Sequence, residues 1–349
     1  MNTKTEQFEV GVLSAAIWLP STFEDSHYIA KETGVPEKVV REKMGIVRKC
    51  RASKDIHPST MAINAAKKAL KNIDPLSIDM VIWTGSEYKD YIVWTAGIFV
   101  QKELGLKNAF AYDISARCGN KILGITLAKS MMLSHPHIKR VLLCGGHRTG
   151  DLVNYKDPSA RFLNNLSDGG SAMVLEKYPA TSAINPILNS SIITDGDFSC
   201  DVIVPAGGTK LPTRQHPAEE STYLTVPDMD SMRVRLEERS IENFIKVIKT
   251  ASSQSMTRPI DYLALLHMKK SAHDAIVERC ELKPEASIYL DHYGHFGAPD
   301  QVLSLGLAEK EQRIKKGDHV VLASAGIGYM WSAVSMRYDQ QIFDGDEKF

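Results

Sequence analysis

The sequence has no apolar run long enough to cross a membrane. Runs such as residues 141–144 fall far short of the roughly 18 residues that a membrane-spanning helix requires. The first six residues also lack the apolar core of a signal peptide. We therefore expect a cytoplasmic protein that does not associate with membranes.

An excess of charge of either sign is missing as well. Lys and Arg together number 42, and so do Asp and Glu, so there is no basic surplus for binding phosphate backbones. Nucleic acid is therefore excluded as the main partner. Hydrophobic residues make up 43% of the 349 residues, which argues against disorder and provides the core of one large α/β body or of two domains.

Cysteine is scarce and unpatterned. The five cysteines, at positions 50, 118, 144, 200 and 280, include no C-x-x-C pair. This odd set favours reduced thiols over a disulfide framework or a zinc site, and we expect no metal. A functional cysteine has to be recognised from its surroundings.

Short apolar segments rich in β-branched residues alternate with longer segments of helical periodicity, which is typical of an α/β protein. The pattern predicts strands over 8–16 and 80–83, helices over 60–70, 96–104 and 240–248, and an irregular connection over 205–230.

An internal repeat with a shift of about 180 residues divides the chain. Three elements recur in the same order, 78–85 as 260–267, 112–118 as 290–295, and 140–146 as 319–326. We expect two duplicated α/β halves, 1–178 and 179–349. Ligands of α/β sheets gather at the carboxyl ends of strands, so Cys118, His267 and His295, each just beyond a predicted strand, are expected to converge on one site.

Cys118 follows a strand-like run and a turn of small residues, and a helix is predicted from about 119 to 133. The positive end of a helix dipole and its free N–H groups favour a thiolate, hence a nucleophile. Arg117 is expected to add to that field. The other four cysteines are expected to be ordinary buried or inert thiols.

Two histidines stand at strand ends. His267 ends the apolar segment 262–266, and His295 lies between glycines that allow a ligand to approach closely. A histidine in such a place can polarise a carbonyl or move a proton, because its ordinary pKa lies near neutral pH. The other nine histidines are expected to be ordinary core or surface residues.

Gly326-Ile327-Gly328 follows the predicted strand 320–323. Its N–H groups either form an ordinary tight turn or face a developing oxyanion. Its place in the repeat favours an oxyanion hole made by the backbone N–H groups of Cys118 and Ile327, with Gly326 and Gly328 at the substrate.

Taken in this order, several segments resemble the β-ketoacyl synthase III type of the thiolase superfamily: 35–46, 73–83, 101–106, 112–123, 166–175, 205–208 and 326–331. The resemblance implies a five-layered αβαβα body of two similar halves, a homodimer, and a cysteine that takes an acyl group from coenzyme A or an acyl carrier protein. No permanently bound cofactor is implied.

The sequence also departs from that family. Synthase III enzymes usually pair the cysteine with a histidine and an asparagine, whereas the asparagine position here is His295, in a turn similar to the Gly-His-x-x-Gly of thiolases. The resemblance therefore implies a Cys118–His267–His295 set. No cysteine lies near 323–328, which disfavours reversible thiolysis.

Glu87 stands 31 residues before Cys118, in a segment that resembles the Gly-Thr-Glu of hydroxymethylglutaryl-CoA synthases. There the glutamate is the general base. A solvated loop carboxylate is the alternative interpretation of Glu87.

The leading hypothesis is an acyltransferase that forms a β-ketoacyl product by Claisen condensation through a Cys118 acyl-thioester, with a decarboxylating acceptor favoured. His267 and His295 are expected to stabilise the enolate of that acceptor. Lys269 and Lys270 are expected to meet the phosphates of coenzyme A or of a carrier protein. The segment around Val93 and Trp94 of a partner subunit is expected to help build the acyl pocket.

Two alternatives remain open. In one, an alcohol, an amine or water takes the acyl group from Cys118, with Glu87 or His295 as base. In the other, the chain is a non-catalytic partner subunit of a related synthase.

Overall fold

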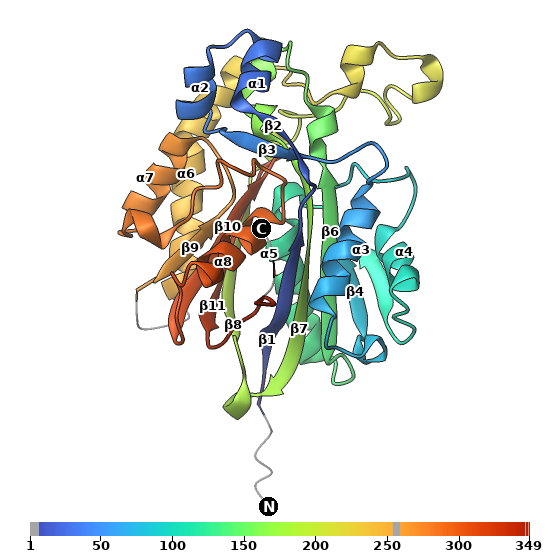
Figure 1. Cartoon of the computed structure of the whole chain (residues 1–349), viewed down its shortest axis with the longest axis vertical. Coiled ribbons are helices and arrows are strands. Elements are labelled where there is room, and N and C mark those ends of the chain that lie inside the picture. Colours follow the sequence, from blue (N-terminus) through green and yellow to red (C-terminus); the bar gives the residue numbers. More distant parts are fainter. Residues whose placement is uncertain (1–6, 254–258, 346, 348) are drawn as a thin grey trace, which may run out of the picture.

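The computed structural model describes residues 7–253, 259–345, 347 and 349. Two β-sheets stand face to face with helices between them and on both outer sides (Figure 1). The arrangement has five layers, as expected from the sequence.

The first sheet contains five strands in the order β1-β7-β6-β4-β5. They span Phe8–Trp18 (β1), Asp168–Pro179 (β7), Arg140–Arg148 (β6), Met80–Trp83 (β4) and Phe110–Asp113 (β5). Strand β4 runs parallel to both β5 and β6, and all four of its residues are buried. This burial explains why its sequence is continuously apolar instead of alternating.

The second sheet repeats this topology. Its order is β8-β11-β10-β9, formed by Ile187–Thr194 (β8), Met330–Tyr338 (β11), Asp318–Gly326 (β10) and Tyr262–Leu265 (β9). Strand β10 is parallel to β9 and antiparallel to β11, just as β6 is parallel to β4 and antiparallel to β7. The repeat seen in the sequence therefore corresponds to two similar halves of the fold.

The helices form the other three layers. Helices α3 (Pro58–Ala69) and α4 (Ala96–Glu103) cover the outer face of the first sheet, and α6 (Met229–Ser253) and α7 (Lys270–Arg279) cover that of the second. Between the sheets lie α5 (Asn120–Ser134) and α8 (Asp300–Lys310), whose apolar residues belong to one core with both sheets. The helix predicted over 240–248 is the middle of the 25-residue α6.

One end of the body is closed by a small antiparallel sheet of β2 (Thr22–Asp25) and β3 (Arg48–Arg51). Helices α1 (Ser26–Thr33) and α2 (Glu37–Glu42) connect these two strands at the same end (Figure 1). The segment 199–228 joins this end as turns and short 3₁₀ stretches, which agrees with the irregular connection expected over 205–230.

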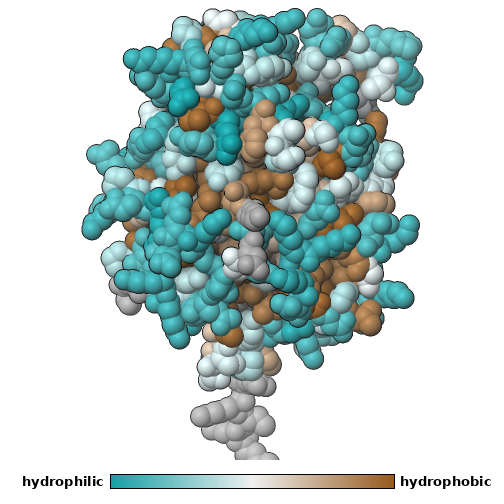
Figure 2. All heavy atoms as spheres, in the orientation of Figure 1, coloured by the Kyte–Doolittle hydropathy of each residue, from teal (hydrophilic) through white to brown (hydrophobic). Residues whose placement is uncertain are grey.

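Hydrophilic and apolar side chains are unevenly distributed over the surface. Figure 2 shows a face whose rim is largely hydrophilic and whose apolar side chains are seen mostly toward the middle. Among the described residues, no helix combines the length and apolarity needed to span a membrane.

Candidate active site

Cys118 lies in a 3₁₀ turn, Arg117–Gly119, between β5 and α5. The turn is strained, because Arg117 has φ of 53° and left-handed backbone is costly for a residue with a side chain. Buried Asn120 holds the turn by accepting from Ala116 N and donating to Gly85 O. Ser324 Oγ donates to Cys118 O at 2.8 Å and so ties the turn to β10 of the other half.

His295 faces Cys118 from the second half. Its backbone is fixed by residues 165–167, with His295 N donating to Asn165 O at 2.7 Å and Ser167 N donating to His295 O at 2.9 Å. Its Nε2 lies 3.1 Å from Cys118 Sγ. Two of the three expected groups are thus within hydrogen-bond reach of each other.

Asp300 completes a chain that the sequence analysis missed. Its Oδ2 accepts from His295 Nδ1 at 2.6 Å and from His267 N at 2.8 Å, and its Oδ1 accepts from Phe296 N at 3.0 Å. The carboxylate is fully buried at the start of α8, where the helix dipole favours negative charge. Cys118, His295 and Asp300 therefore have the arrangement of nucleophile, base and orienting carboxylate.

The groups around His295 favour its protonated form. Burial alone lowers the pKa of His295, but the charges of Cys118 and Asp300 outweigh burial and raise the pKa well above its ordinary value. An imidazolium beside the sulfur stabilises the thiolate, which is the nucleophilic form of cysteine.

His267 lines the same cavity as Cys118 and His295, but its ring forms hydrogen bonds within the protein. Its Nε2 donates to Gly45 O at 2.9 Å, and its Nδ1 accepts from the Asn165 side-chain amide at 3.2 Å. The ring also stacks on Tyr289, with centroids 5.1 Å apart. Both ring nitrogens therefore have partners within the protein, while His267 lines the cavity with Cys118 and His295 as expected.

Glu87 contacts the Arg117–Gly119 turn that carries Cys118, here called the nucleophile turn. Its carboxylate pairs with Arg117 Nη1 at 2.9 Å and accepts from Ser115 Oγ at 2.7 Å. Burial raises the pKa of Glu87, but Arg117 and Ser115 outweigh it and hold the pKa below its ordinary value. The carboxylate is therefore charged and engaged, which suits positioning of the turn better than base catalysis.

The expected oxyanion hole lies where β10 meets the nucleophile turn. Gly326 packs so closely that an added Cβ would lie 2.4 Å from Ala116 O and 3.2 Å from Cys118 N. The absence of a side chain lets β10 approach, and Ile327 and Gly328 then line the cavity next to Cys118.

A cavity of about 1820 Å³ joins these groups to the surface. This is larger than the roughly 300–1,000 Å³ of ordinary ligand pockets. Lys269 and Arg161 lie on its wall with Cys118, His267, His295 and Glu87, and much of the remaining lining is apolar, including Val35, Val39, Phe162, Ile203 and Leu224.

Four residues that were expected to contact the substrate are not among the described residues that line this cavity. Gly326 packs behind the nucleophile turn, and Lys270 pairs with Asp274 on the surface of α7. Val93 is fully exposed with φ of 51°, and Trp94 packs against Tyr91 and Phe99.

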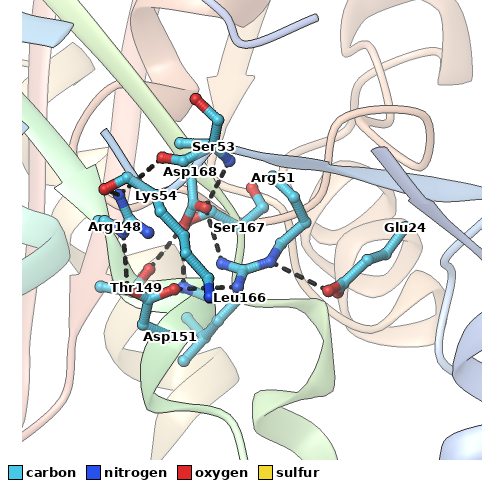
Figure 3. Close-up of polar contacts among 12 residues, drawn as sticks. Glu24, Arg51, Ser53, Lys54, Arg148, Thr149, Asp151, Leu166, Ser167 and Asp168 are labelled. Carbon is cyan, nitrogen blue, oxygen red and sulfur yellow. Dashed lines mark hydrogen bonds and ion pairs between the residues drawn. The ribbon is translucent and has the colours of Figure 1, made fainter. Parts of the chain in front are cut away.

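A dense ionic cluster stands beside the cavity (Figure 3). Arg51 lies among three carboxylates, Glu24 at 3.1 Å, Asp151 at 3.0 Å and Asp168 at 2.7 Å. Fully buried Asp168 also accepts from the backbone of Ala52 and Gly150. This cluster, which we call the Arg51 cluster, fixes β3 to the start of β7 and supports the cavity wall at Asp151.

Two family models match the chain. Residues 112–196 match 3-oxoacyl-[acyl-carrier-protein] synthase III, and residues 251–338 match the C-terminal part of the same family. A β-ketoacyl-[acyl-carrier-protein] synthase III of Syntrophomonas wolfei is 26% identical over 96% of this chain and 100% of its own. One of Clostridioides difficile is 27% identical over 97% and 99%.

These matches support a synthase III-like protein of the thiolase superfamily. Solved structures show the same fold. A 3-oxoacyl-[acyl-carrier-protein] synthase III of Aquifex aeolicus superposes with a TM-score of 0.79 at 21% identity, over 94% of this chain and 100% of that one. OleA of Xanthomonas campestris, solved with bound lauric acid and lauroyl-CoA, gives a TM-score of 0.79 at 18% identity, over 95% and 99%.

The predicted family, fold and enzyme class, a condensing acyltransferase, are thereby confirmed. The roles of individual residues stay predictions.

Proposed function

We propose that Cys118 takes an acyl group from an acyl-CoA or acyl carrier protein thioester and passes it to a malonyl-type thioester. The observation that carries this proposal is the 3.1 Å contact between Cys118 Sγ and His295 Nε2 at the cavity. A nucleophile paired with an oriented base is the arrangement that acyl-enzyme chemistry requires.

In the first step, the Cys118 thiolate attacks the donor carbonyl, and the N–H groups of Cys118 and Ile327 hold the oxyanion. The carbon–sulfur bond to the donor thiol then breaks. His295 gives its Nε2 proton to that thiol, and Asp300 keeps the other proton on Nδ1.

In the second step, the acceptor loses carbon dioxide and the electron pair of the broken C–C bond forms an enolate. The enolate carbon attacks the acyl carbonyl on Cys118, and the bond from that carbonyl to sulfur breaks. Cys118 returns as a thiolate, His295 takes a proton from water at Nε2, and the β-ketoacyl thioester leaves.

Binding and assembly complete the proposal. Lys269 on the cavity wall meets the phosphates of the thioester arm, Lys270 adds positive charge nearby, and Gly326 and Gly328 keep the backbone close to the thioester. The enzyme is a homodimer in which Val93 and Trp94 approach the partner's acyl pocket. The halves are 1–178 and 179–349, each built around one sheet.

A second candidate is transfer of the acyl group to an alcohol, an amine or water. It is favoured by the Cys118–His295–Asp300 chain, because once Cys118 is acylated the neutral His295 has a free Nε2 lone pair that can take the acceptor's proton. A non-catalytic role is disfavoured by the same chain, since an inert subunit needs no oriented base.

The test is intact-protein mass spectrometry. Wild-type protein is incubated with acetyl-, octanoyl- or lauroyl-CoA, and malonyl-CoA is then added while released carbon dioxide is measured. We expect an adduct on Cys118, absent in Cys118→Ala, that disappears with stoichiometric carbon dioxide and a β-ketoacyl product. Loss of the adduct to hydroxylamine or water but not to malonyl-CoA would favour the second candidate, and no adduct at all would refute both.

A further inference from the structure

Asn165 links the two histidines of the site. Its backbone O accepts from His295 N at 2.7 Å, and its side-chain amide lies 3.2 Å from His267 Nδ1. The residue is partly buried and lines the cavity together with both histidines. The reaction proposed above gives its side chain no role.

The backbone around Asn165 is fixed from two sides. Leu166 pairs with His295 in a short parallel bridge, and Ser167 N donates to His295 O at 2.9 Å. Fully buried Lys49 donates from Nζ to Leu166 O at 2.7 Å. The Asn165 side chain therefore extends from a backbone that has little freedom to shift.

The partners of His267 determine which of its ring nitrogens carries the proton. Gly45 O can only accept, so its contact of 2.9 Å with His267 Nε2 requires an N–H there. Burial lowers the pKa of His267 to about 4, so the ring is neutral near pH 7 and Nδ1 has a lone pair. The Asn165 amide can bind that lone pair only with its NH₂ group. The 3.2 Å contact is therefore a hydrogen bond from Asn165 Nδ2 to His267 Nδ1.

The proposed condensation gives this tautomer a use, and the argument rests on that proposal. An enolate oxygen needs an N–H donor, and a neutral imidazole can provide one. His267 is expected to stabilise the enolate, and it can do so only in the tautomer with hydrogen on Nε2, because Nδ1 is bound to Asn165. A charged enolate oxygen is a stronger acceptor than a peptide carbonyl, so it can take over this N–H from Gly45 O.

We infer that Asn165 is a positioning residue of the condensation, whose side-chain amide holds the His267 ring in the orientation and tautomer that present the Nε2 N–H to the enolate oxygen. No proton is transferred in this role. The amide hydrogen stays on Asn165 and the Nε2 hydrogen stays on His267, and both groups act through hydrogen bonds alone.

A carboxylate of the same shape reverses the polarity of this contact. In Asn165→Asp the side chain can only accept, so His267 must carry a proton on Nδ1. The ring is then either an imidazolium, which keeps the Nε2 N–H, or a neutral ring whose Nε2 has only a lone pair. The new carboxylate raises the pKa of His267 and so favours the imidazolium at low pH. The variant should therefore lose the donor as the pH rises through that pKa, whereas the wild-type protein keeps it.

The pH dependence of His267 has to be separated from that of its neighbours. The titratable and charged groups around the ring are Asp300, Asp291, His295, His273, Tyr289, Lys269 and Lys270. All of them are present in the variant and in the wild-type protein. Dividing the variant rate by the wild-type rate at each pH therefore removes most of their contribution.

The experiment separates loading from condensation in Asn165→Asp and Asn165→Leu. Each protein is acylated with whichever of acetyl-, octanoyl- and lauroyl-CoA loads wild-type Cys118 fastest, freed of donor, and mixed with saturating malonyl-CoA in a single turnover at several pH values. Ser199→Asp is the matched control, because Ser199 also lines the cavity but belongs to the segment 199–228, so its carboxylate tests the effect of added charge alone.

We expect both Asn165 variants to load Cys118 within about 3-fold of wild type. Asn165→Leu should condense about tenfold more slowly at every pH, the effect of one lost hydrogen bond to a buried group. Asn165→Asp should condense within about 3-fold of wild type at the acidic end of the series and at least about tenfold more slowly at the alkaline end. Ser199→Asp should keep a constant ratio to wild type.

Condensation by Asn165→Leu at the wild-type rate would overturn the inference, and this variant alone decides if Asn165→Asp does not fold. A ratio for Asn165→Asp that does not change with pH, or that Ser199→Asp reproduces, would also overturn it. So would equal losses in loading and condensation, which would indicate a structural role only. If wild-type protein loads Cys118 but never condenses with malonyl-CoA, the proposed function itself fails, and the inference fails with it.

Discussion

Two charged clusters stand beside the cavity and differ in whether every member is paired within the protein. In the Arg51 cluster, the guanidinium meets three carboxylates and Asp168 is further bonded to the backbone (Figure 3). In the chain from Asp300 through His295, the last member is Cys118, whose sulfur faces the cavity. A cluster whose members are all paired within the protein stabilises the fold. A cluster whose last member faces the cavity can react with a substrate.

The largest expected effect comes from removing that reactive end. Cys118→Ala is expected to lose at least about 10⁴-fold in turnover, because no other group can carry the acyl chain. Thermal unfolding should be little changed, since Cys118 lies partly exposed at the cavity. Turnover of acyl-CoA with malonyl-CoA checks this, and residual activity above about 1% would show that another residue is the nucleophile.

Breaking the closed cluster should instead reduce stability. Arg51→Met leaves fully buried Asp168 without its cation, and the loss of one partner of a buried pair costs about 3 kcal/mol or more. Urea unfolding measures this, with Arg279→Met as control because its partner Glu242 is exposed and such pairs contribute about 0–1 kcal/mol.

If the Arg51 cluster only stabilises the fold, Arg51→Met should not change the reactivity of Cys118. Alkylation of Cys118 by iodoacetamide should proceed within about 3-fold of the wild-type rate. A large fall in that rate in folded Arg51→Met would mean that the two clusters are coupled.

Asp300→Asn should affect reactivity through His295. Without the carboxylate, His295 loses the charge and the hydrogen bond of Asp300, two of the effects that raise its pKa, and the imidazolium beside Cys118 becomes less stable. We expect alkylation of Cys118 at pH 7 to slow by about 10- to 100-fold and its onset to move to higher pH.

Glu309→Gln is the control for Asp300→Asn. Glu309 is another carboxylate that accepts from backbone, at Ile342 and Phe343, but it has no histidine partner. It should lower stability without moving the pH profile. An unchanged profile in Asp300→Asn would reduce Asp300 to a purely structural residue.

Much of the fold was predictable because it depends on local patterns. The apolar segment 80–83 predicts β4 with its observed bounds, and the repeat predicts that β9 and β10 correspond to β4 and β6. Cys118 and His295 were also predicted from local signals, a helix start and a glycine-flanked turn.

The contacts of the site that could not be predicted from the sequence depend on packing between segments far apart in the chain. Asp300 follows Pro299 at a helix start, which is a local signal, but its bond to His267 N needs α8 to lie against the end of β9. Gly45 meets His267 only because the segment after α2 folds over the cavity. No spacing in the sequence places Arg51 between Glu24, Asp151 and Asp168.

The smallest expected effect is the acid sensitivity of the buried histidines. Burial lowers the pKa of His147, His267 and His273 to about 4, so each takes up a proton more readily in the unfolded chain. The stability that they contribute is complete above about pH 6.5 and is lost as the pH falls toward 4. Urea unfolding at several pH values checks this, and His273→Asn should lessen the slope between pH 6.5 and 5. An unchanged slope would mean that His273 is protonated in the folded protein.

The most direct measurement of the central claim is competitive labelling of the five cysteines with iodoacetamide at pH 7, followed by peptide mapping. Burial raises the pKa of Cys50 and Cys144 to about 12 and that of Cys280 to about 11, so the informative pair is Cys118, only partly exposed, and Cys200, which is exposed. The account predicts that Cys118 reacts first, at least about tenfold faster than Cys200, because His295 and Asp300 stabilise its thiolate. Labelling that follows exposure, with Cys200 ahead of Cys118, would contradict it.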